Sequence, residues 1–130
     1  MTPFGSRIRE LRRERGLTMK EMAAALRVTS AYLSALEHGR RGRPSWPLVQ
    51  AIIGYFNVIW EDAEELERLA RISHPRVVID TSGLGPQATE AANRLAAEIA
   101  HMSSSEIAML IALLDRRQRR TVRKAKMSRR

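Results

Sequence analysis

The chain has 130 residues, of which 44% are hydrophobic, a net charge of +9 and no cysteine. This length suits one domain, or one small domain with an appendage, and the lack of cysteine excludes disulfides, thiolate metal sites and a cysteine nucleophile. The longest run without a polar side chain, residues 107–114, is far shorter than a membrane span, and the first residues lack the apolar core of a signal peptide. We therefore expect a soluble cytoplasmic protein without a membrane segment.

The charge is unevenly distributed along the chain. Residues 1–45 carry ten bases and four acids, residues 46–115 carry four bases and ten acids, and residues 116–130 carry nine bases and no acid. A polyanion would attract the two ends of the chain and repel its middle.

The first 45 residues contain three short helical patterns. Apolar residues on one face predict a helix from Phe4 to Arg15, which Gly16 ends. Thr18 and Glu21 form a capping box for a second helix, and Thr29 can cap a third. The last two helices, joined by a tight turn, predict a helix-turn-helix, whose second helix is shaped to enter the major groove of DNA.

Two further helices follow a basic loop at residues 40–45. One begins near Trp46, with Pro47 in its first turn, and we expect Trp46 and Trp60 to pack over it. The other covers about residues 61–72 and has acids in its first turn, where they complement the helix dipole. Together, the five helices make a complete small bundle.

Residues 4 to about 70 resemble the DNA-binding domain of the lambda-repressor-like (Cro/cI, or XRE) transcriptional regulators. The resemblance rests on Ile8, Leu11 and Arg12; Gly16-Leu17-Thr18; Glu21 and Ala23; Val28-Thr29; and Leu33-Ser34-x-Leu36-Glu37-x-Gly39. It implies a five-helix domain that binds operator DNA, usually as a dimer on a two-fold site. It also implies that Arg12 pairs with Glu37 as part of the scaffold.

The resemblance places the base-reading positions at Ser30, Ala31, Tyr32 and Ala35. The full set of candidate DNA-binding residues is Arg27, Thr29, Ser30, Ala31, Tyr32, Ser34, Ala35, His38, Arg40, Arg41 and Arg43.

The chain departs from the family pattern at several of these positions. Met19 replaces a phosphate-binding Gln, and Arg27 replaces a Gly in the turn, which predicts a positive φ for an Arg. Because Ala31 and Ala35 can contact only thymine methyl groups, we hypothesise that specificity depends on the arginines of the 40–45 loop, placed in a narrow minor groove.

Residues 76–80 are β-branched and predict an extended segment, either a linker or a strand paired with a second subunit; we favour the linker. Pro86 opens a helix whose apolar residues repeat at spacings of four and three, and Ser103 and Glu106 cap another with Ile107 and Leu114 on one face. This hairpin either closes the core of the same chain or forms a dimer interface, and we favour the dimer.

The last segment, residues 116–130, is dense in like charge, which favours disorder. It serves either as a solubilising tail or as a nonspecific DNA contact, the function that we favour. The predicted fold is all-α: a helix-turn-helix domain (1–73), an extended linker (74–86), a C-terminal helical hairpin (87–115) and a basic disordered tail (116–130).

Residues with catalytic or metal-binding chemistry are sparse. The three histidines, His38, His74 and His101, lie far apart without the spacing of metal ligands, and no nucleophile has a neighbouring base. We therefore expect no cofactor, no metal and no enzymatic activity.

The leading hypothesis is a sequence-specific regulator that binds double-stranded DNA as a homodimer. One alternative is an antitoxin-like module, whose C-terminal hairpin holds a protein partner and whose DNA binding is autoregulatory. Another is a nonspecific architectural DNA-binding protein.

Overall fold

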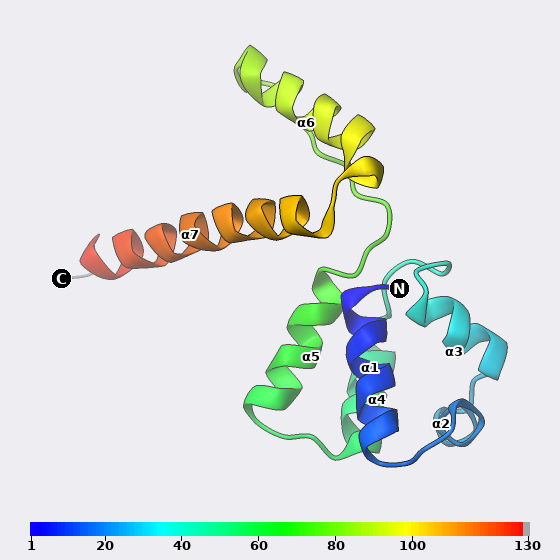
Figure 1. Cartoon of the computed structure of the whole chain (residues 1–130). Helices are drawn as coiled ribbons and strands as arrows, with labels where there is room; N and C mark the ends of the chain where they lie inside the picture. Colours follow the sequence, from blue (N-terminus) through cyan, green and yellow to red (C-terminus); the bar gives the residue numbers. More distant parts are fainter. Residues whose placement is uncertain (129–130) are drawn as a thin grey trace. The chain divides into compact units, whose positions relative to one another are not determined.

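The structure is a computed structural model, and it describes residues 1–128 (Figure 1). The described residues contain seven α-helices, one 3₁₀ turn and no strand. They divide into two compact units, Met1–Val78 and the residues from Ile79 on. None of the described helices is both long and apolar enough to cross a membrane.

The first unit consists of the five predicted helices. They are α1 (Pro3–Glu14), α2 (Met19–Leu26), α3 (Ser30–Glu37), α4 (Trp46–Phe56) and α5 (Glu61–Arg71). Each of the first four begins after a hydroxyl residue that accepts the N–H three positions later: Thr2 from Gly5, Thr18 from Glu21, Thr29 from Tyr32 and Ser45 from Leu48. Such caps are typically worth about 1 kcal/mol each, so the helix starts are set by local sequence.

All five helices contribute to one hydrophobic core. Its buried residues are Phe4, Ile8, Leu11, Met22, Ala23, Leu33, Val49, Ile52, Phe56, Leu66 and Ala70. These are positions where the sequence places apolar residues at helical spacing, which confirms the predicted five-helix bundle. Trp46 and Trp60 do not pack over α4 as expected, since 61% and 81% of their surfaces are exposed.

The end of α3 is held against the start of α1. The N–H of Thr2 donates to the carbonyl oxygen of Glu37 at 3.0 Å, and the Thr2 hydroxyl donates to the same oxygen at 3.3 Å. Gly5 lies so close that an added Cβ would stand 2.2 Å from that oxygen. Glycine is therefore required at position 5 by a close helix–helix contact.

A buried ion pair joins the same two helices. The Arg12 guanidinium donates to both carboxylate oxygens of Glu37, with an Nη2–Oε2 distance of 3.3 Å. Glu37 is 2% exposed and Arg12 is 8% exposed. The pairing implied by the family resemblance is confirmed, and the bidentate geometry satisfies both charges away from water.

The second unit contains α6 (Pro86–Glu98), a 3₁₀ turn at Ile99–His101 and α7 (Ser104–Ser128). Ser103 and Glu106 form the predicted capping box, with bonds of 2.9 and 3.2 Å. The N–H of Ser103 and its hydroxyl also lower the pKa of the Glu106 carboxyl below its ordinary value. Neither α6 nor α7 has a buried residue, and the core cluster of the first unit contains only residues 4–70.

The prediction of a disordered basic tail is wrong for residues 116–128, which continue α7 as helix. The density of like charge was outweighed by a capped helix start and by residues of good helix propensity, mainly Arg, Lys, Gln and Ala. Bases near the end of a helix also complement its dipole. Residues 129–130 of the predicted tail lie outside the described residues.

The close contact at Gly5 predicts an asymmetric response to alanine. Gly5→Ala should destabilise the first unit by about 1–3 kcal/mol, as overpacking does, because the obstacle is the backbone of α3. Gly54→Ala is the matched control: nothing lies within 4 Å of its added Cβ, so stability should rise by up to about 1 kcal/mol. Denaturant unfolding of both variants measures the difference, and equal midpoints would contradict the packing at Gly5.

The buried ion pair predicts strong coupling between its partners. Arg12→Met leaves the Glu37 carboxylate buried and unpaired, which should cost about 3–5 kcal/mol. Arg12→Met combined with Glu37→Leu removes both charges and should regain most of that loss. Unfolding free energies of the two single variants and the double variant test this, and additive losses would show that the pair is not coupled.

Candidate nucleic-acid interface

The orientation of α3 follows from what it buries. Leu33, Leu36 and Glu37 face the core, so the helical period turns Ala31, Ala35 and His38 outward. Ser34 and Tyr32 lie at the two edges of this outward face. In Figure 1, α2 and α3 lie on the side of α1 and α4 away from α5, and α5 packs against α1 and α4. The face is thus presented away from the acidic helix.

Few polar groups stand on the outward face of α3. Ser30 is exposed, while the Thr29 hydroxyl oxygen is occupied as the cap of Tyr32. His38 caps the helix end, and its Nδ1 lies 2.8 Å from the carbonyl oxygen of Ser34. Because a carbonyl only accepts, that nitrogen carries the proton, and Nε2 is left for another partner.

The turn between α2 and α3 contains an arginine in a left-handed conformation. Arg27 has φ 58° and ψ 40° and is the C-cap of α2, as the absence of the usual glycine predicted. Its side chain is exposed. The backbone strain of a non-glycine residue here is tolerated in a position that puts a cation at the edge of α3.

The loop after α3 carries three more exposed arginines, Arg40, Arg41 and Arg43. Gly39 and Gly42, at φ 79° and 75°, allow the loop to turn sharply. The loop turns back on the helix, since the Arg41 guanidinium carbon lies 5.9 Å from the centre of the Tyr32 ring. A cation at this distance is attracted to the ring face, so Arg41 and Tyr32 are positioned as a pair.

The contact between Arg41 and Tyr32 was not predicted from the sequence. Its partners are separated by most of α3 and a loop, and no periodic signal relates them. With Val28, Thr29, Ser45 and Leu48 they line a shallow depression where the start of α3 meets the start of α4.

The electrostatic contrast between the two sides of the unit is sharp. Residues 17–45 contain five bases and only two acids, and one of these acids, Glu37, is buried and neutralised by Arg12. On α5, Arg68 donates two hydrogen bonds to Glu65, at 2.7 and 2.9 Å. These bonds hold the pKa of the Glu65 carboxyl below its ordinary value.

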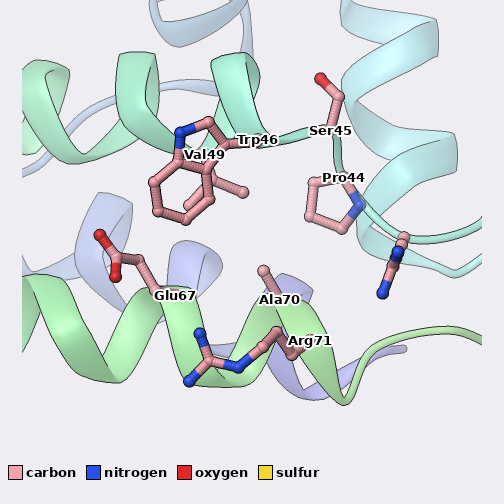
Figure 2. Close-up of a pocket in the computed structure, with 8 residues that line it drawn as sticks. Pro44, Ser45, Trp46, Val49, Glu67, Ala70 and Arg71 are labelled. Carbon is pink, nitrogen blue, oxygen red and sulfur yellow. The ribbon is translucent and has the colours of Figure 1, made fainter.

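A groove of about 340 Å³ lies between the start of α4 and α5, and Arg43 of the basic loop also lines it (Figure 2). Trp46 and Val49 form one wall, Ala70 and Arg71 the other, and Pro44 closes one end. Among residues 1–128, no group of three or more histidines, aspartates or glutamates is placed to hold a metal ion.

Most of the candidate DNA-binding residues lie on α3 and on the segments next to it in the sequence, whereas Arg43 lines the groove beside α5. Arg27, Thr29 and the exposed residues of α3 lie along the helix-turn-helix, and Arg40, Arg41 and Arg43 follow it directly. Ser34 and Ala35 are half-buried, so they offer less surface to a ligand than Ala31 or His38.

Comparison with known proteins bears on the same residues. A family model described as a helix-turn-helix domain matches residues 3–69, which is just over half of the chain. One relative is the uncharacterized HTH-type transcriptional regulator RghRB of Bacillus subtilis (strain 168), 37% identical over 62 residues, covering 48% of this chain and 45% of that protein. Another is the HTH-type transcriptional regulator DdrOP3 of Deinococcus deserti, 41% identical over 59 residues, covering 45% of each protein. The chain thus spans less than half the length of these curated relatives.

A search of solved structures aligns the chain with a SinR protein/SinI protein complex at a TM-score of 0.41 and 20% identity, covering 88% of this chain and 97% of that one. The sequence match over residues 3–69 is the stronger finding, and it coincides with the five helices of the first unit. The chain belongs to the helix-turn-helix domain family, and its first unit is a helix-turn-helix domain of the lambda-repressor-like, XRE type.

Proposed function

We propose that this protein is a sequence-specific transcriptional regulator that binds double-stranded DNA by placing α3 in the major groove. The observation that carries the proposal is the outward face of α3, flanked by four exposed arginines, Arg27, Arg40, Arg41 and Arg43. Phosphate contacts by such cations supply affinity, and groups at base edges supply specificity. Both relatives are named as HTH-type transcriptional regulators, which supports the same function.

Different side chains are proposed to contact the bases and the phosphates. Ala31 and Ala35 can contact thymine methyl groups, and Ser30 and the Tyr32 hydroxyl are the polar readers. Met19, half-buried against the core, cannot make the phosphate contact that a Gln in its place would make. The arginines before and after α3 therefore supply much of the affinity for DNA.

The 40–45 loop is proposed to read DNA shape. Arginine inserted in a narrow minor groove senses its enhanced negative potential rather than base edges. Arg41 is held on Tyr32, whereas Arg40 and Arg43 are exposed on either side of it. Arg43, next to the start of α4, is the residue that we assign to the minor groove.

Dimerisation on a two-fold operator completes the proposal. Ile107, Leu110, Ile111 and Leu114 lie along one face of α7, and none of them is buried. Pairing this face with a second copy would cover it and bring two α3 helices to two half-sites.

The same exposed face favours a second candidate, a partner-binding module with autoregulatory DNA binding, in which another protein covers it. A purified chain that stays monomeric would favour that candidate.

Selection of genomic fragments by the purified chain tests the function. Enrichment of a palindromic motif is the expected result, because two copies related by a two-fold axis read two half-sites. Dimer-sized particles in sedimentation should accompany it. No enrichment over random fragments would refute sequence-specific binding and leave an architectural role.

Shape reading by the loop predicts the behaviour of Arg43→Ala. Affinity for the selected site should fall about 10–100-fold, and affinity for random duplex should fall less, because only the specific site has the groove that Arg43 recognises. Arg68→Ala, which removes the same charge from α5, is the matched control and should change neither affinity appreciably. Equal losses on both duplexes, measured by competition binding, would reduce Arg43 to a phosphate contact.

A further inference from the structure

The second half of α7 carries an unusual concentration of charge. Seven bases and no acid lie between residues 116 and 128, namely Arg116, Arg117, Arg119, Arg120, Arg123, Lys124 and Lys126. All seven are exposed, and all belong to one continuous helix, Ser104–Ser128. The bases are therefore fixed to a rigid frame rather than spread over a disordered tail.

Between residues 116 and 126, the helix separates its bases from its uncharged residues. At the helical rotation of about 100° per residue, Leu110, Ile111, Leu114, Gln118, Thr121, Val122 and Ala125 all project within about 60° of the direction of Ile107. Every one of the seven bases projects at least about 80° away from it. One uncharged stripe thus runs along α7 from Ile107 to Ala125, and the bases cover the other side of the helix between residues 116 and 126.

A dense cluster of bases on one side of a helix is complementary in charge to a polyanion. The seven span a rise of about 15 Å, comparable to the distance over which salt screens exposed charges. The nearest acid on the helix is Asp115, and Glu106 is engaged in the capping box. Duplex DNA carries one charge per about 1.7 Å of axis, so 15 Å of duplex offers about nine phosphates. The charge density of the helix and that of DNA are matched.

We propose that residues 116–126 of α7 form a second duplex-binding surface, separate from α3, that contacts the phosphate backbone without reading sequence. The proposal rests on the proposed function only in taking DNA as the polyanion. A membrane surface fits less well, because an interfacial helix needs large apolar residues opposite its bases. Opposite these bases stand Gln118, Thr121, Val122 and Ala125, and the sequence has no aromatic residue after Trp60.

The stripe makes this surface compatible with dimerisation. A second copy that covers Ile107, Leu110, Ile111 and Leu114 would continue along the same uncharged face. The bases point away from that face and would remain free for phosphates in the dimer. One helix would then hold the partner along its first half and the backbone of DNA along its second.

Salt dependence of binding by the full chain tests the proposal. The variant replaces Arg119, Arg120 and Arg123 with Gln, which has similar helix propensity and leaves the stripe intact. On random duplex, the slope of log K against log salt should shrink by about 2–3, near 0.9 for each lost phosphate contact. Affinities for random and selected duplex should fall by the same factor, with circular dichroism unchanged.

The control variant replaces Arg68, Arg71 and Arg76 with Gln, which changes the net charge equally in the first unit. Its slope should change by less than about 1. An unchanged slope in the α7 variant, or an equal change in the control, would overturn the proposal. Loss of binding to phosphatidylserine vesicles without loss on DNA would also overturn it and assign the helix to a membrane. If the salt slope changes in the α7 variant but selection yields no motif, the α7 surface is supported and sequence-specific reading is refuted. If selection yields a motif but the salt slope is unchanged, sequence-specific reading is supported and the α7 surface is refuted.

Discussion

The recognition surface depends on how the end of α3 is held at Glu37. Its carbonyl accepts hydrogen bonds from Thr2, its backbone packs on Gly5, and its carboxylate is paired with Arg12. These three contacts come from α1 and its N-cap residue, and they act on one residue that is 2% exposed. Because a helix cannot rotate about its axis without moving the residues that it buries, fixing Glu37 also decides which side chains α3 turns outward. A buried pair is weak evidence for stability. Here the pair holds the end of α3, the helix that we propose to enter the major groove.

Apolar and charged groups are unevenly distributed over this part of the protein. The outward face of α3 is small and apolar at Ala31 and Ala35, and exposed arginines lie in the turn before α3 and in the loop after it. Arg27 occupies a strained left-handed turn, and Arg41 is held on the ring of Tyr32. Binding energy from phosphates is strong but indifferent to sequence, so in the proposed function a few hydroxyls, thymine contacts and the shape of the groove would supply the discrimination. The acids of α5 lie on the other side of the unit, where they would repel phosphate.

Sequence reasoning succeeded where the signal is local. Thr18, Thr29 and Ser103 cap helices as their spacing predicts, the apolar periodicity marks the core, and the missing glycine predicts the positive φ of Arg27. It failed where the outcome depends on position in space. The density of bases after Asp115 suggested disorder, yet their angular placement leaves an uncharged stripe along a continuous helix. The contact of Arg41 with Tyr32 and the close approach at Gly5 depend on the tertiary fold, and the sequence carries no local sign of either.

The central claim is that the outward face of α3, together with the turn before it and the loop after it, is the surface that meets DNA. Amide chemical shifts of the labelled chain, followed while a duplex is added, test this most directly. Within the first unit, the largest changes are expected between Arg27 and Arg43, with α5 from Glu61 to Arg71 left almost unchanged, since its acids repel phosphate. Changes concentrated on α5, with residues 27–43 unaffected, would contradict the account.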